Sequence, residues 1–202
     1  MKRLILASHN KDKIREFEAL LAPLNYAVFG MRSVGFEDEI VEDGSSFIEN
    51  SVIKARALKK AFPHDAVLAD DSGLSIEALG GEPGIYSARF GGEEMPYASK
   101  FDLIWQRLKA TGLAEEEWRA YFTACLCLIE EDGALRIFED QVHGLILPEP
   151  RGAAGFGYDP IFFCQEVGKS FAELSSEEKN CCSHRAKASR ALLRYLDARD
   201  RH

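Results

Sequence analysis

The sequence has no long apolar run. Nothing in its 202 residues approaches the roughly 18 consecutive apolar residues that a membrane-spanning helix needs. Two basic residues at the start are followed only by the short apolar stretch Leu4 to Ala7, and polar residues from Ser8 onward come at once. This pattern is typical of a first β-strand and not of a signal peptide. We therefore expect no membrane partner.

Cysteine pairs and surplus basic charge are also missing. The five cysteines are odd in number and include no Cys-x-x-Cys motif, which favours free thiols in a reducing cytoplasm over a zinc site. The net charge of −8 argues against a nucleic-acid polymer as partner, because such binding needs a broad basic surface. A single nucleotide, whose phosphates require only a few local cations, is not excluded.

The pattern of apolar residues predicts an α/β protein. The length suits one domain over residues 1–202, and there are no repeats, low-complexity tracts or linkers. We expect an elongated mixed β-sheet flanked by helices, forming two lobes with a central active-site cleft. Apolar periodicity and turn residues predict strands at 4–7, 26–31, 66–69, 121–129, 134–142 and 161–164. Helices are expected after Asn10, after Ser46, at 98–109 and from about 176 to 197.

The segment from Ser8 to Lys13 joins a strand end to a helix start. Such a turn directs backbone N–H groups and the positive end of the helix dipole at an anion. Asn10 can cap the helix, and Lys13 can reach a phosphate. The alternative is a capped surface helix with a solvated lysine.

Two neighbouring acids, Asp70 and Asp71, end a hydrophobic stretch. Adjacent carboxylates there repel each other unless a cation or hydrogen bonds offset the charge. One or two carboxylates together with phosphate oxygens suffice for Mg²⁺. In a strand the two side chains point to opposite sides, so we expect only one to face a substrate. Glu42 is the candidate second ligand, and Glu49, a capping-box residue, is its competitor.

The segment from Gly155 to Asp159 places Phe156, Tyr158 and a carboxylate among glycines. Aromatic faces stack on bases, and a fixed carboxylate accepts hydrogen bonds from ring N–H groups. Lys179, His184 and Arg185 surround the start of the final helix, where they could donate to a base. The alternatives are an aromatic anchor for a loop and a basic face of a surface helix.

These motifs together resemble a known family. The order Ser-x-Asn-x-x-Lys, Phe-Ile-Glu-Asn, Asp-Asp-Ser-Gly-Leu, Pro-Gly-Ile-Tyr-Ser-Ala-Arg, Phe-Gly-Tyr-Asp-Pro and Ser-His-Arg is similar to that of the inosine/xanthosine triphosphate pyrophosphatases (HAM1-like). The resemblance runs from residue 4 to about 196. It implies a Mg²⁺-dependent homodimer that converts ITP, dITP or XTP to the monophosphate and pyrophosphate, removing deaminated purines from the nucleotide pool.

The resemblance also implies residue roles. Asp71 would be the general base, and Glu42 and Asp71 would bind the metal. The substrate would be bound by Ser8, His9, Asn10, Lys11, Asp12, Lys13, Ser72, Phe156, Gly157, Tyr158, Asp159, Lys179, His184 and Arg185. Arg185 carries only donors, so it would suit the 6-oxo group of hypoxanthine or xanthine.

Two other functions remain open from the sequence. A related pyrophosphatase could act on modified pyrimidine nucleotides, although the basic N-terminal signature of that family is missing here. A nucleotide-binding sensor could keep the pocket without turnover, but such a binder has no need for the Asp70–Asp71 pair.

Overall fold

The computed structural model describes residues 1–201. Its helices are α1 (Lys11–Leu21), α2 (Phe47–Ala61), α3 (Tyr97–Ala110), α4 (Ser176–Cys182) and α5 (His184–Asp200). Its strands are β1 (Lys2–Leu6), β2 (Tyr26–Gly30), β3 (Ala66–Ile76), β4 (Arg119–Ile129), β5 (Leu135–Ile146), β6 (Phe162–Cys164) and β7 (Lys169–Ser170).

These strands form a mixed sheet in the order β2-β1-β3-β4-β5-β6-β7. β1 is parallel to β2 and β3, whereas β6 is antiparallel to β5 and β7. The predicted α/β class and mixed sheet are confirmed. The chain divides into two compact units. The single domain and the central cleft stay predictions.

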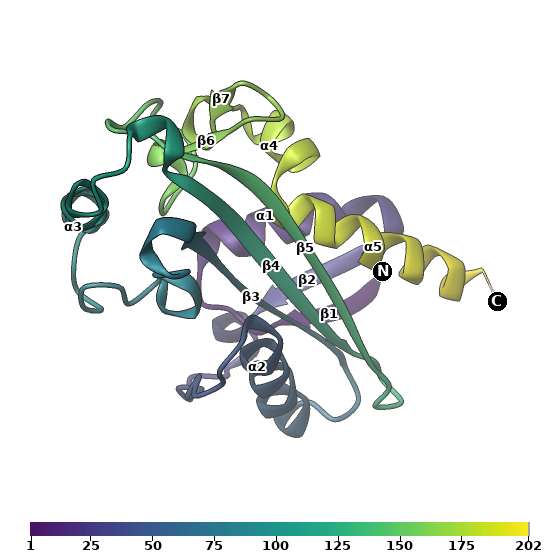
Figure 1. The fold of residues 1–202 in the computed structure, drawn as a ribbon. Helices are drawn as coiled ribbons and strands as arrows, with labels where there is room; N and C mark the ends of the chain where they lie inside the picture. The colour runs from purple at the N-terminus through teal and green to yellow at the C-terminus, as the bar shows by residue number, and fades with distance from the viewer. Residues whose placement is uncertain (202) are drawn as a thin grey trace. The chain divides into compact units, whose positions relative to one another are not determined.

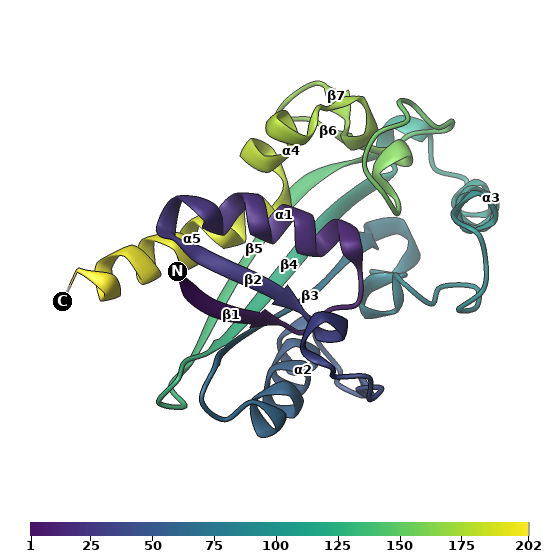
Figure 2. The same cartoon turned by 180° about the vertical axis from the view of Figure 1, so that it is seen from behind.

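Unit 1 contains residues 1–71, 124–140 and the chain from Arg185 onward. Its strands carry apolar side chains on alternate faces, as the two-residue period of a strand requires. Leu4 and Leu6 pack with Phe17 of α1, and α5 contributes to the same cluster. Ile5 packs with Leu58 of α2 on the other face. α1 and α2 therefore cover opposite faces of β1 and of the first part of β3 (Figures 1 and 2).

Unit 2 contains residues 72–123 and 141–184. Its core joins Ile104 and Leu108 of α3 to aromatic side chains of the sheet. Phe122 of β4 meets Phe162 of β6 edge-on, with ring centroids 4.8 Å apart. Burial of such large aromatic side chains is the main source of stabilisation available to a small core.

The prediction of a single final helix from about 176 to 197 is wrong. The segment forms two helices, because Ser183 has the extended backbone angles φ −68° and ψ 159° and ends α4. Lys179 therefore lies on α4, whereas His184 and Arg185 begin α5.

Two further elements differ from the expectation. The strand predicted at 66–69 continues to Ile76 as β3, so Asp70 and Asp71 lie within it. The helix expected after Ser46 is α2; apolar spacing would place Ile48 on its buried face with Val52 and Ala55, but Ile48 is 42% exposed. The buried face of α2 includes the polar side chains of Asn50, Ser51 and Lys54.

Within residues 1–201, none of the helices has both the length and the apolar character needed to cross a membrane. The cysteines are free thiols, as predicted, and Cys181 is the exposed one among them.

Candidate functional site

In unit 1 the carboxyl end of β1 lies beside the middle of β3, where Leu6 is opposite Leu68. The strands are parallel neighbours, and the N–H of Ala7 donates to the carbonyl of Leu68 over 2.8 Å. The residues that follow β1 therefore lie next to the β3 residues just beyond Leu68, at the carboxyl end of β1, which is the usual end for ligands in such sheets. The Ser8–Lys13 turn and the two acids of β3 are brought together there.

The predicted cap on α1 is confirmed. Asn10 Oδ1 accepts the N–H groups of Asp12 (2.8 Å) and Lys13 (3.3 Å), and Ser8 Oγ accepts the N–H of Asn10 (3.1 Å). Because the cap uses two of the first N–H groups of the helix, an anion at this turn would depend on the helix dipole and on the Lys13 side chain.

The other predicted residues of this turn lie at the surface. His9 and Lys11 are exposed, and Asp12 forms an ion pair with Arg15 at 2.5 Å.

Strand alternation separates the two acids of β3. Asp70 follows Leu68 on the face covered by α1 and α5, and Asp71 follows Ala69 on the face covered by α2. Their partners differ accordingly: Asp70 pairs with Lys13 and Arg185, and Asp71 with Lys54. The prediction that the side chains point to opposite sides is confirmed.

Asp70 is the centre of a buried ion cluster. Its Oδ2 accepts from Arg185 Nε at 2.9 Å and lies 3.2 Å from Lys13 Nζ. Arg185 Nη1 also donates to Glu16. Burial alone would raise the pKa of Asp70, but Arg185 and Lys13 outweigh it and hold that pKa well below its usual range. Asp70 is therefore a permanently ionised anchor for two cations.

Asp71 has a different environment. Lys54 Nζ donates to Asp71 Oδ1 at 2.9 Å and to Glu42 Oε2 at 3.2 Å, so two carboxylates converge on one ammonium group. Burial raises the pKa of Asp71, and the attraction of Lys54 and Lys13 offsets this only in part. A carboxylate with a raised pKa is a better proton acceptor than an ordinary one.

The residues around Asp71 fit a hard cation. Asp71 Oδ2 is buried and has no hydrogen-bond partner in residues 1–201, although unpaired buried oxygens are costly. In those residues no cluster of three or more His, Cys, Asp or Glu side chains could hold a metal. Mg²⁺ does not need one, since it keeps several waters and binds through one or two carboxylates plus phosphate oxygens.

The contacts of Glu49 favour Glu42 as the second ligand. Glu49 Oε2 accepts both the N–H and the hydroxyl of Ser45, each at 2.7 Å. Its own N–H donates to Ser46 Oγ at 3.1 Å. Ser46 caps α2 as predicted, but the Glu49 carboxylate bonds one residue earlier than in a capping box.

A second group of predicted residues comes together in unit 2. Lys179 Nζ donates to Asp159 Oδ2 at 2.6 Å and lies 4.5 Å from the centroid of the Phe156 ring. Asp159 Oδ2 also accepts the N–H of Phe156 at 2.8 Å. A side chain at Gly155 would meet that oxygen at 2.1 Å, and φ there is +73°, so the tight turn needs glycine.

Two aromatic residues complete this group. His184 stacks on Phe122 with ring centroids 4.6 Å apart and an interplanar angle of 8°. The Tyr158 hydroxyl donates to the carbonyl of Ser87 at 2.8 Å. Tyr158 is thus 3% exposed and serves the core, whereas Phe156, on the same turn, is half-buried.

The predicted residues divide between the units at two places in the chain. Asp71 ends one segment of unit 1 and Ser72 begins unit 2; His184 ends unit 2 and Arg185 resumes unit 1. The pairing of Arg185 with Glu16 was not predicted. The helical spacing of Glu16 and Lys13 on α1 was its only sequence signal.

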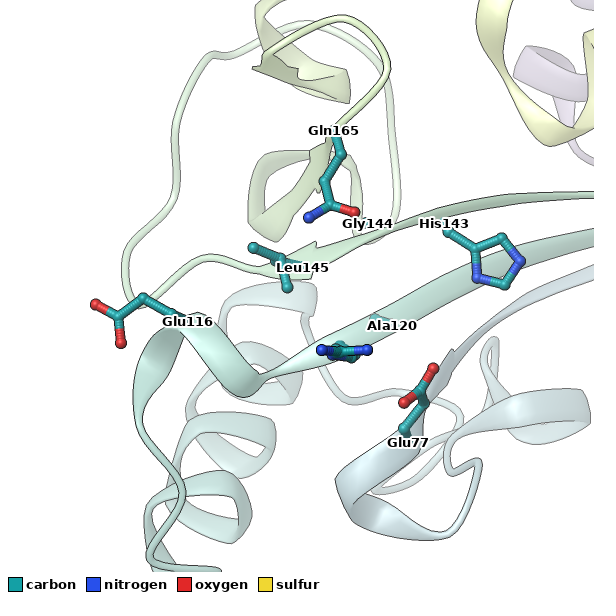
Figure 3. A pocket seen from close by; sticks show the side chains of 8 residues that line it. Glu77, Glu116, Ala120, His143, Gly144, Leu145 and Gln165 are labelled. Carbon is teal, nitrogen blue, oxygen red and sulfur yellow. The ribbon is translucent and has the colours of Figure 1, made fainter.

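Unit 2 also contains a cavity of about 270 Å³ (Figure 3). No residue predicted to bind the substrate or the metal lines it. Its lining residues are Glu77, Glu116, Arg119, Ala120, His143, Gly144, Leu145 and Gln165.

The fold and the site define an α/β protein with a buried cluster of carboxylates and cations at the edge of a parallel strand pair. The chain belongs to the Ham1 family, whose model matches residues 4–195.

Similar proteins extend over nearly the whole chain. A dITP/XTP pyrophosphatase of Bacillus subtilis is 43% identical, with 98% of each chain covered. One from Thermus thermophilus is 44% identical, covering 95% of this chain and 90% of its own. The solved structure of a HAM1 protein from Coxiella burnetii has a TM-score of 0.88 at 36% identity, covering 98% of this chain and 100% of that one.

Proposed function

We propose that this chain is a nucleoside-triphosphate pyrophosphatase that hydrolyses dITP, XTP and ITP to the monophosphate and pyrophosphate. Such an enzyme removes deaminated purines from the nucleotide pool. The observation that carries the proposal is the cluster of Asp71, Lys54 and Glu42 beside Lys13. The relatives named dITP/XTP pyrophosphatase, aligned over nearly the full chain, support the same activity.

In this proposal the residues that bind the phosphates belong to unit 1. Lys13 and Lys54 attract the triphosphate and neutralise charge that grows on its oxygens during the reaction. Asp71 accepts a proton from the water molecule that attacks the α-phosphorus, and pyrophosphate is the leaving group. Burial, which raises the pKa of Asp71, suits the carboxylate to that role.

We further propose that Glu42 and Asp71 hold Mg²⁺. The bound ion would supply charge neutralisation at the phosphate oxygens. The unpaired Oδ2 of Asp71 and the approach of Glu42 to the same ammonium group support this choice. Lys54 would keep both carboxylates oriented and ionised until the metal binds.

The base would be recognised in unit 2. The Phe156 ring offers a stacking surface, and Asp159 offers a carboxylate to ring N–H groups. Lys179, bonded to Asp159, holds that carboxylate in place. We also propose a contact from Arg185, which belongs to unit 1 and is bonded to Asp70 and Glu16. Because Arg185 has only donors, it would favour a 6-oxo group over a 6-amino group.

The test is pyrophosphate release from ITP, XTP, GTP and ATP, with Mg²⁺ and with EDTA. We expect metal-dependent release from ITP and XTP and at least about tenfold slower turnover of GTP and ATP. For ATP the reason is the mismatch between its 6-amino group and the donors of Arg185; GTP has a 6-oxo group, so this contact does not distinguish it from ITP. Release of single phosphates would contradict the proposal. Binding of ITP without release would indicate a sensor, and turnover of modified pyrimidine nucleotides instead would indicate the pyrimidine-specific relatives.

A homodimer is part of the proposal, because the family resemblance implies it. Sedimentation velocity at micromolar concentration should give a boundary at twice the mass of the chain. A purely monomeric boundary would remove the dimer and leave the proposed activity in place.

A further inference from the structure

The segment that carries Glu42 is bound to the start of α2 at successive residues. The N–H of Gly44 donates to Asn50 Oδ1 at 2.9 Å. The N–H of Ser45 donates to Glu49 Oε2 at 2.7 Å, and Ser46 is the N-cap of the helix. The loop from Glu42 to Ser46 is therefore held by side chains of the first turn of α2.

Two residues of α2 hold this loop near the metal-site acids. Asn50 and Lys54 are four positions apart, so they lie one turn apart on the same helix face. Lys54 contacts the Glu42 carboxylate. Asn50 binds the backbone N–H of Gly44, which is two residues after Glu42 in the chain. One helix face thus fixes both the side chain of Glu42 and the chain that carries it.

Gly44 allows the loop to lie directly against the helix. A Cβ atom there would be 2.7 Å from Asn50 Oδ1, 2.8 Å from Glu49 Cβ and 3.0 Å from the Asn50 backbone nitrogen. Contacts this short are not tolerated without movement of the backbone. The absence of a side chain at Gly44 is therefore required for the hydrogen bond to Asn50.

Asn50 is an unusual choice for a buried helix position. Its side chain is 0% exposed, and its Nδ2 has no hydrogen-bond partner in residues 1–201. An apolar residue would avoid the unpaired amide. What the amide provides is its acceptor, since a backbone N–H donates to it and so fixes Oδ1 toward Gly44.

We propose that Asn50 is a positioning residue for the metal site: through Gly44 it holds Glu42 where that carboxylate shares a cation with Asp71. This inference rests on the proposed function, because it assigns Asn50 to the Mg²⁺ site of that activity. Partners of metal ligands typically contribute 10- to 100-fold to metal affinity or activity.

The experiment compares wild type, Asn50→Ala and Gly44→Ala. Binding of Mn²⁺ to the free proteins is followed by electron paramagnetic resonance, and pyrophosphate release from ITP is measured over a range of Mg²⁺ concentrations. We expect both variants to bind Mn²⁺ about 10- to 100-fold more weakly. They should need correspondingly more Mg²⁺ for half-maximal release, while the rate at saturating Mg²⁺ and the KM for ITP stay close to wild type.

Ser51→Ala is the matched control. Ser51 is the next buried polar residue of α2, and its hydroxyl contacts the Ile48 carbonyl and Cys125 Sγ, so it tests for general damage to the helix. Its Mn²⁺ affinity should equal that of wild type. If Asn50→Ala does not fold, Gly44→Ala still breaks the same contact.

Wild-type Mn²⁺ affinity in both variants would overturn the inference while leaving the proposed function intact. An equal loss of affinity in Ser51→Ala would overturn it too, because the effect would then be a general one. If wild type itself neither bound Mn²⁺ nor released pyrophosphate, the proposed function would fail, and the inference with it.

Discussion

Asp70 and Asp71 are neighbours in the chain with opposite electrostatic surroundings. Both are buried with one oxygen unpaired, but Arg185 and Lys13 hold the pKa of Asp70 well below its usual range, whereas burial raises the pKa of Asp71. The two-residue period of β3 causes the difference, because it directs one acid toward α1 and α5 and the other toward α2. Only Asp71 has the properties of a base.

Replacing Asp71 with Asn should therefore cost on the order of 10² or more in the rate of pyrophosphate release, as loss of a general base typically does. Steady-state kinetics at saturating Mg²⁺ measures the loss. Glu42→Gln is the comparison, since its defect should shrink as Mg²⁺ is raised and that of Asp71→Asn should not. Near-normal turnover by Asp71→Asn would remove Asp71 from the mechanism.

The contribution of Asp70 to the free energy of unfolding should depend on pH. Its pKa is lower in the folded state than in the unfolded state. Its contribution is therefore complete above the unfolded pKa of about 3.9 and is lost as the pH falls toward the folded value. Asp70→Asn should cost about 3 kcal/mol at pH 7, because it leaves Arg185 and Lys13 buried with less compensation.

Urea unfolding of wild type and Asp70→Asn from pH 7 to pH 3 measures this contribution. The difference should be constant down to about pH 4 and then decrease. Asp197→Asn, which removes an exposed ion pair with Arg201, should change stability little at any pH. A difference between Asp70→Asn and wild type that grew on acidification would show that the assignment is wrong.

At the scale of single elements, the N-terminus of α1 combines a structural and a binding role. Asn10→Ala removes the acceptor of two N–H groups and should lower the free energy of unfolding by about 1 kcal/mol. Asn10→Asp keeps the cap but adds negative charge where phosphates are proposed to bind. We expect it to be as stable as wild type and to have a raised KM for ITP.

Thermal or urea unfolding and steady-state kinetics separate the two effects. If Asn10→Asp bound ITP as well as wild type, the phosphates would not lie at this helix start. If Asn10→Ala were as stable as wild type, the capping contacts would contribute nothing measurable.

Elements with a clear apolar period could be predicted from the sequence, and elements decided by distant contacts could not. α1, α3 and β2 follow their apolar spacing. The break at Ser183 carries no glycine or proline, and its local signal is limited to the serine itself, a common residue at helix N-caps. The polar buried face of α2 depends on contacts with the preceding Glu42 loop and with β3, which the apolar spacing of the helix does not record.

The site shows the same limit. Its motifs predicted the candidate residues, and the alternation within β3 was predictable from strand geometry. The residues that pair with one another in the site could not be predicted. Arg185 and Glu16, for example, are 169 positions apart, and the packing of α5 beside α1 brings them together. Helical periodicity also predicted one continuous final helix. Such a helix gives no indication that His184 belongs to unit 2 and Arg185 to unit 1.

At the scale of the whole molecule, charge separates a single nucleotide from a nucleic-acid polymer. The chain has a net charge of −8, yet Lys13, Lys54 and Arg185 all pair with the two adjacent acids of β3. A polymer needs basic residues spread over a broad surface, where each neutralised phosphate adds to affinity. A triphosphate needs only the local cations.

We therefore expect ITP to bind in the presence of Ca²⁺, used in place of Mg²⁺ to slow turnover, while a fluorescent 20-base-pair DNA duplex does not bind at 150 mM salt. Isothermal titration calorimetry measures the first and fluorescence anisotropy the second. Lowering the salt should leave the duplex unbound, because excess negative charge repels its backbone more strongly when screening is reduced. Duplex binding that tightened steeply as salt was lowered would reveal a basic surface and contradict this reading of the charge distribution.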